Sequence, residues 1–76
     1  MAENLIISDG TKVQKYQTLL QQVIALAENE SDTIALMANI SSMIHHTFGF
    51  FWTGFYRVSG DELVLGPFQG PLACTR

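Results

Sequence analysis

The sequence of 76 residues has one cysteine, Cys74, and this scarcity excludes two kinds of small protein. A single thiol cannot build an internal disulfide framework, and it cannot supply the thiolate cluster of a structural zinc site. Cations are also scarce, because four Lys and Arg stand against seven Asp and Glu, for a net charge of −3. We expect no phosphate-binding surface and no nucleic-acid partner, because the cations are dispersed singly at Lys12, Lys15, Arg57 and Arg76.

Long hydrophobic runs and targeting signals are missing as well. No apolar stretch approaches the roughly 18 uninterrupted residues that a membrane-spanning helix needs, so we expect no membrane insertion. Residues 1–4 (MAEN) lack the basic and apolar regions of a secretory signal. We therefore expect a cytoplasmic protein, in which a thiol stays reduced. The sequence also has no glycine-rich phosphate loop and no Ser/His/Asp arrangement, so neither a nucleotide loop nor a hydrolytic triad is predicted.

What the sequence does have is an excess of apolar residues. They make up 47% of the chain, against 14% charged residues, which is an apolar-rich composition for a soluble domain. A chain of this length buries only about 60–65% of its extended surface, so other material must cover part of the apolar area. A partner, a second copy or the remainder of a larger domain would do so. Because the Gly/Pro-rich segment around Cys74 stops without a terminating signal, we expect the last, with residues 1–76 as the N-terminal half of a single domain.

The spacing of the apolar residues predicts two helices within residues 11–48, after an N-terminal arm at residues 1–10. We expect Ser31 to cap the second helix, because its hydroxyl can accept a hydrogen bond from the first turn. Asp32 would add negative charge where the helix dipole favours it. Gly49 is expected to end this helix, since glycine commonly provides the left-handed residue that follows a helix.

The periodicity changes to two after Gly49, which predicts a β-hairpin over residues 50–66. Its parts are an aromatic first strand, a tight turn and a returning strand, at residues 50–58, 59–61 and 62–65. Residues 67–76 are predicted to form a loop that carries Cys74.

Helices followed by antiparallel strands indicate an α+β fold, with the helices packed on one face of the sheet. Two strands alone are not stable in water. Within this chain, a third strand would have to come from residues 4–7 or 71–75. Otherwise the remainder of the domain must supply the missing strands.

Aromatic residues alternate along the first predicted strand, where Trp52, Gly54 and Tyr56 share one face. One interpretation is a core strand that is covered on both sides. The other is a binding surface, because Gly54 would leave a gap between two amphipathic rings, and aromatic faces attract small apolar or cationic groups.

Cys74 has two interpretations as well. A lone cysteine is often a small buried hydrophobe. Its place just after a Gly/Pro segment, outside any periodic apolar face, favours a redox or nucleophilic thiol instead. The adjacent pair His45 and His46 is the other candidate for chemistry, but neighbours on a helix point about 100° apart. We therefore expect no metal site there, and favourable charge at a helix C-terminus instead.

Three segments of the second half resemble the free methionine-(R)-sulfoxide reductases, a family of single GAF domains: residues 51–56 (FWTGFY), 60–71 (GDELVLGPFQGP) and 73–76 (ACTR). The resemblance covers the N-terminal half of the family's domain. It implies a GAF-like antiparallel sheet with the N-terminal helices packed on one face.

The resemblance also implies a chemistry. In this family a cysteine thiolate attacks the sulfur of free methionine sulfoxide, methionine leaves, and a sulfenic acid remains. A second cysteine then forms a disulfide, which thioredoxin reduces, so no bound cofactor is expected. Cys74 matches the resolving cysteine, and Trp52 and Tyr56 match the aromatic pair around the sulfoxide and methyl end of the substrate. The family's attacking cysteine and its carboxylates lie C-terminal to Arg76, so this chain alone is expected to be inactive.

Two alternatives remain open at this point. A non-catalytic GAF-type module would bind a small ligand or dimerise without depending on Cys74. An interaction protein would use its apolar excess as a dimer interface. We expect a homodimer on the resemblance, and the apolar composition is compatible with one.

Overall fold

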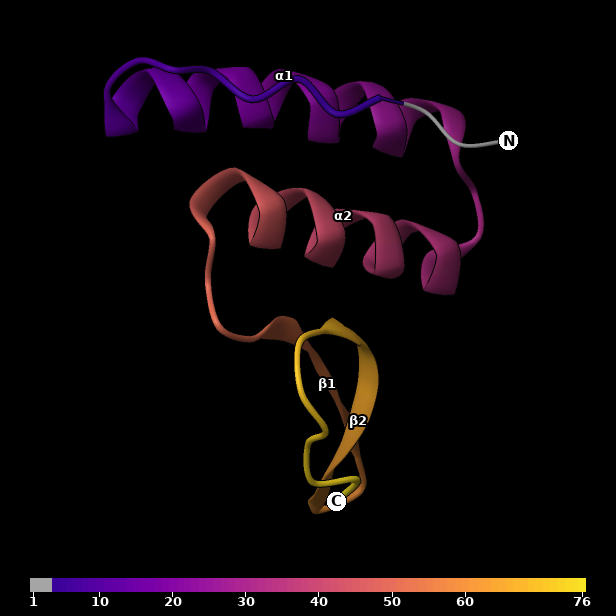
Figure 1. Cartoon of the computed structure of the whole chain (residues 1–76). Helices are drawn as coiled ribbons and strands as arrows, with labels where there is room; N and C mark the ends of the chain where they lie inside the picture. Colours follow the sequence, from indigo (N-terminus) through magenta and orange to yellow (C-terminus); the bar gives the residue numbers. More distant parts are fainter. Residues whose placement is uncertain (1–3) are drawn as a thin grey trace.

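The computed structural model describes residues 4–76, which form two helices followed by a two-stranded antiparallel hairpin (Figure 1). The elements are α1 (Lys12–Asn29), α2 (Thr33–Phe48), β1 (Thr53–Ser59) and β2 (Glu62–Gln69). Helix α1 packs on α2, and α2 packs on both strands. In the described residues α1 does not contact the hairpin. The expected α+β fold is confirmed, with α2 as the layer between α1 and the hairpin.

Both helices begin with a side-chain cap. In α1, the Thr11 hydroxyl accepts a hydrogen bond from the Gln14 backbone at 3.2 Å, and Gln14 Oε1 accepts one from the Thr11 backbone at 2.8 Å. This reciprocal capping box satisfies two N–H groups that would otherwise lack partners. In α2, the cap is Asp32, whose carboxylate accepts from the Ala35 N–H at 2.9 Å.

The prediction of Ser31 as the cap of α2 was therefore wrong by one residue. Asp32 combines the acceptor oxygen with a negative charge at the positive end of the helix dipole, so one side chain performs both roles. The predicted C-terminus is confirmed, because Gly49 adopts the left-handed conformation with φ of 67° and its N–H bonds to the His45 carbonyl.

The hairpin has the predicted turn but different bounds. Ser59 pairs with Glu62 across a two-residue turn, and Gly60 takes a φ of 63°, as a glycine does at the first position of a type II′ turn. Strand β1 begins at Thr53 rather than at residue 50. Phe50 instead turns toward α2, where its ring stacks on Phe48 at 5.5 Å.

Strand β2 is longer than predicted, because residues 67–69 belong to it and not to the loop. A β-bulge makes this possible. The register shifts between Gly54 and Tyr56, so that Gly66 and Pro67 together oppose the single residue Phe55. A proline has no N–H to donate to a ladder, and a bulge is a place where a strand tolerates it.

Little of the apolar content is buried. Leu19 is the buried hydrophobic residue of the described chain, beside the buried polar residues Ser41 and Thr47. An apolar stripe on α1 stays 48–64% exposed, at Val13, Tyr16, Leu20 and Ile24. The expectation that 76 residues cannot cover this composition is therefore confirmed. Across residues 4–76, the structure contains no helix with the length and hydrophobicity to cross a membrane.

Candidate functional site

Three aromatic rings stack on one side of the hairpin. Trp52, the residue immediately before β1, lies in the middle, with its ring centroid 6.0 Å from Tyr56 and 5.5 Å from Phe68. The interplanar angles of 27° and 16° are those of stacked rings. Sequence alternation correctly placed Trp52 and Tyr56 on one face. It missed Phe68, because that residue was assigned to the loop, and only the length of β2 brings it opposite Gly54.

The predicted gap over Gly54 is filled. A Cβ atom at this position would lie 2.4 Å from Phe68 Cβ and 2.7 Å from Trp52 Cη2, closer than side-chain carbons approach one another. The neighbouring rings thus occupy the space that the sequence suggested for a ligand. The residue of this cluster that remains exposed is Tyr56, at 38%.

Gly54→Ala is expected to displace the Trp52 ring and to lower the free energy of unfolding by about 1–3 kcal/mol, the usual cost of overpacking. Trp52 is the one tryptophan of residues 1–76, so its fluorescence reports on this ring once any tryptophan elsewhere in the full-length protein is replaced by phenylalanine. Urea unfolding followed by that fluorescence measures both effects. Wild-type stability together with an unchanged emission spectrum would show that the rings do not press on Gly54.

The other side of the Trp52 ring is also closely packed. Gly70 has a φ of 122°, and a Cβ there would lie 2.7 Å from the Phe51 carbonyl oxygen and 3.1 Å from Trp52 Cδ1. The indole Nε1 is buried and has no hydrogen-bond partner in the described residues. Trp52 is therefore held by stacking and by the close approach of two glycines, not by its polar group.

Cys74 is exposed within residues 4–76 and its thiol is free, so these residues do not bury it as a small hydrophobe. After β2 the chain turns back beside the hairpin (Figure 1), and its last residue, Arg76, pairs with Glu62 at the start of β2. Residues 71–75 do not form the third strand that the sequence left open. Only one backbone bond joins them to β2, from the Leu65 N–H to the Thr75 carbonyl at 3.0 Å.

Two side chains also hold this C-terminal segment. The Tyr56 hydroxyl donates a hydrogen bond to the Cys74 carbonyl oxygen at 2.9 Å. Arg76 Nε lies 3.2 Å from Glu62 Oε2, in an ion pair that is exposed on both sides. The structure thus brings together all three residues that the sequence proposed for a site, through the ring of Tyr56 on Trp52 and its hydroxyl on Cys74.

The two histidines lie in the last turn of α2, as predicted. His46 Nδ1 is 2.8 Å from the Ser42 carbonyl oxygen, and His45 Nδ1 is 3.4 Å from Thr53 Oγ1. Within residues 4–76 the structure contains no group of three or more His, Cys, Asp or Glu side chains that could hold a metal ion.

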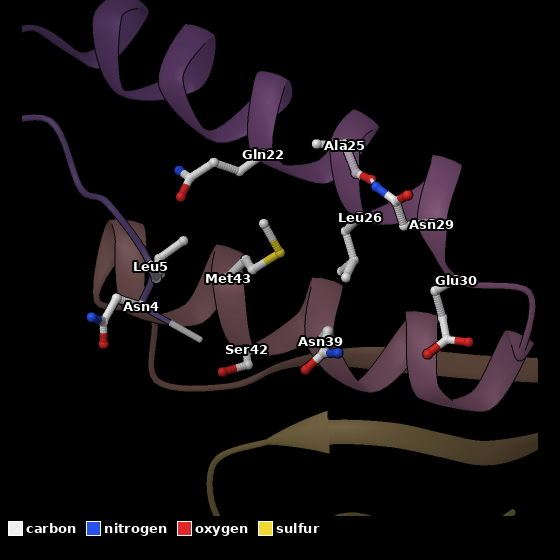
Figure 2. Close-up of a pocket in the computed structure, with 10 residues that line it drawn as sticks. All are labelled: Asn4, Leu5, Gln22, Ala25, Leu26, Asn29, Glu30, Asn39, Ser42 and Met43. Carbon is white, nitrogen blue, oxygen red and sulfur yellow. Dashed lines mark hydrogen bonds between the residues drawn. The ribbon is translucent and has the colours of Figure 1, made fainter. Parts of the chain in front are cut away.

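A cavity of about 750 Å³ lies away from the aromatic cluster, between the N-terminal arm, α1 and α2 (Figure 2). Gln22 fixes the arm there, since its side chain bonds to the Ile6 N–H at 2.9 Å and to the Ile6 carbonyl at 2.8 Å. The lining mixes apolar with amide side chains, among them Leu26, Met43, Asn29 and Asn39. Sequence reasoning missed this cavity, because the arm has no periodicity that would indicate where it packs.

Comparison with known proteins gives a consistent result, although no family model matches the chain. GAF domain-containing protein A of Dictyostelium discoideum is 51% identical over 77 residues, covering 100% of this chain and 49% of that protein. The free methionine-R-sulfoxide reductase of Escherichia coli is 39% identical over 66 residues, covering 86% of this chain and 40% of that protein.

A solved structure agrees with these relatives. The free methionine-R-sulfoxide reductase of Neisseria meningitidis, determined in complex with its substrate, superimposes with a TM-score of 0.89 at 44% identity. The alignment covers 95% of this chain and 44% of that one. The resemblance to these reductases and the GAF-like fold are thus confirmed, and the chain spans about half the length, or less, of the curated relatives it matches.

Proposed function

We propose that the protein containing this chain is a free methionine-R-sulfoxide reductase, and that residues 4–76 contribute the resolving cysteine and an aromatic wall to its active site. The resemblance to reductases of that name supports the activity. The observation that carries the site is the hydrogen bond of Tyr56 to the Cys74 carbonyl, made while the Tyr56 ring stacks on Trp52. The backbone of an exposed cysteine is therefore bound to a residue of the aromatic cluster.

The first step of the proposed reaction needs a cysteine from outside this chain, because Cys74 is the only one within it. That thiolate attacks the sulfoxide sulfur, and in net terms the oxygen passes to the attacking sulfur. The substrate is reduced by two electrons to methionine, and the thiol is oxidised by two electrons to a sulfenic acid.

In the second step Cys74 resolves the sulfenic acid. Its sulfur forms the S–S bond as the S–O bond breaks, and the oxygen leaves as water with two protons. The dithiol of thioredoxin then reduces this disulfide by exchange and leaves as its own disulfide. The exposure of Cys74 supports both steps, because the thiol must be reached by the sulfenic acid and its disulfide by thioredoxin. The proposal needs no bound cofactor, and a reducing compartment such as the cytoplasm would keep Cys74 available.

The aromatic pair is proposed to contact the sulfoxide and methyl end of the substrate. Aromatic faces make favourable contacts with sulfur and with methyl groups, and Tyr56 is partly exposed. The carboxylates that hold the substrate's ammonium, like the attacking cysteine, would come from the remainder of the domain. We therefore propose that this chain is inactive by itself.

A second candidate is a non-catalytic GAF-type module that dimerises. The exposed apolar stripe of α1 favours it, together with an adjoining apolar groove of about 260 Å³ that includes Tyr16, Leu20, Ile44 and Phe50. A homodimer is proposed under both candidates. They differ in their dependence on Cys74, which only the reductase requires.

The proposed activity is tested by a thioredoxin-coupled assay on the full-length protein that contains this sequence. We expect NADPH oxidation with free methionine-(R)-sulfoxide, and much less with the (S)-epimer or with a sulfoxide inside a peptide. If no epimer is reduced while the protein is folded, the non-catalytic module becomes the better account.

A further inference from the structure

The Tyr56 side chain makes two separate contacts. Its ring is stacked against Trp52, 6.0 Å between centroids, and the residue as a whole is 38% exposed. Its hydroxyl donates a hydrogen bond to the carbonyl of Cys74, 18 residues further along the chain. The ring and the hydroxyl of one residue therefore serve different partners, and a substitution that removes only the hydroxyl can separate them.

The C-terminal segment has few other attachments to the hairpin. The ion pair of Arg76 with Glu62 is 67% and 55% exposed, and pairs of this kind contribute little. The bond of Leu65 to Thr75 fixes the residue after the cysteine. Within residues 4–76, one side chain forms a hydrogen bond with Cys74 itself, and it is that of Tyr56. The position of the Cys74 backbone thus depends mainly on the hydroxyl of Tyr56 and on one backbone hydrogen bond.

We infer that the Tyr56 hydroxyl is a positioning group for Cys74. It holds the backbone of this residue against the hairpin, and so acts on disulfide formation rather than on substrate binding. The effect on disulfide formation rests on the proposed function. The attachment of the C-terminal segment by Tyr56 rests on the geometry alone. Attack on the sulfenic sulfur requires the two sulfur atoms to be held close and aligned. A loose segment would bring Cys74 into that arrangement for a smaller fraction of the time.

The test is Tyr56→Phe in the full-length protein, since phenylalanine keeps the ring that faces the substrate. Loss of one neutral hydrogen bond should change the population of the anchored segment by about threefold to tenfold. We expect the Leu65 amide hydrogen to exchange faster by that factor. In single turnover, disulfide formation at Cys74 should slow by the same factor, and by more than the release of methionine slows.

Tyr16→Phe is the matched control, because it removes the same hydroxyl from α1, where the ring packs on Phe48. It should leave Leu65 exchange and disulfide formation unchanged. Unchanged Leu65 exchange in Tyr56→Phe would overturn the anchoring. A raised KM with an unchanged disulfide rate would overturn the positioning role. If the wild-type protein forms no methionine, both the proposed function and the role of Tyr56 in disulfide formation are overturned. The hydrogen exchange of Leu65 would still decide whether Tyr56 anchors the C-terminal segment.

Discussion

Replacing Cys74 by serine is expected to abolish thioredoxin-dependent turnover in the full-length protein. Without a resolving thiol, the sulfenic acid stays on the attacking cysteine, and only one methionine forms per active site. A thiol held inside the site acts at a far higher effective concentration than one from solution, so we expect a loss on the order of 100-fold or more in kcat. Steady-state NADPH oxidation, compared with methionine released in a single turnover, measures this result.

The substitution should not affect folding, because Cys74 is exposed and surface changes usually alter the free energy of unfolding by less than about 0.5 kcal/mol. Thr75→Ser is a suitable control on the same segment, since it keeps the backbone bond to Leu65. If Cys74→Ser turned over as fast as the wild type, Cys74 would have no part in the mechanism, and the resolving thiol would have to lie elsewhere.

Trp52→Ala is expected to have the second large effect, on both stability and substrate handling. Truncation of a buried tryptophan typically costs about 3–5 kcal/mol. A value near 3 kcal/mol is expected here, because Trp52 is half-buried and stacks on two rings, Tyr56 and Phe68. Loss of the central ring also removes the support of Tyr56, so the KM for methionine-(R)-sulfoxide should rise.

Trp52→Phe separates the effect on stability from the effect on substrate binding. Phenylalanine keeps a ring that can stack, but it offers the substrate a smaller surface. Urea unfolding and the KM should be measured on the same preparations of both variants. Both variants should show a raised KM for methionine-(R)-sulfoxide, provided that each is folded under the conditions of the assay. An unchanged KM in both would remove Trp52 from the substrate site and leave it a structural role only.

Local features of this fold could be predicted from the sequence because their causes are local. The spacing of apolar residues located both helices, and Gly49 and Gly60 marked a helix end and a turn through their freedom to take positive φ. The error at Ser31 and Asp32 is also local, because two adjacent residues could each cap α2 and only one side chain is needed. Which of the two residues caps the helix depends on a small difference in free energy between two neighbouring backbone conformations.

The site was less predictable because it depends on register and on contacts distant in sequence. Alternation placed Trp52 and Tyr56 on one face, but nothing local indicates that a bulge at Gly66 and Pro67 extends β2 far enough to bring Phe68 over Gly54. The bond from Tyr56 to Cys74 spans 18 residues. It depends on how the segment after β2 turns back, and no periodic pattern encodes that path.

The most direct test of the reductase account is a disulfide map after a single turnover. The reduced full-length protein would be mixed with excess free methionine-(R)-sulfoxide without thioredoxin, then alkylated and digested without reduction. If the protein is this reductase, about one methionine is released per active site, and Cys74 is recovered in a disulfide with a cysteine from outside residues 1–76. Methionine release that leaves Cys74 as an alkylated free thiol would contradict its role, and no methionine release would contradict the reductase itself.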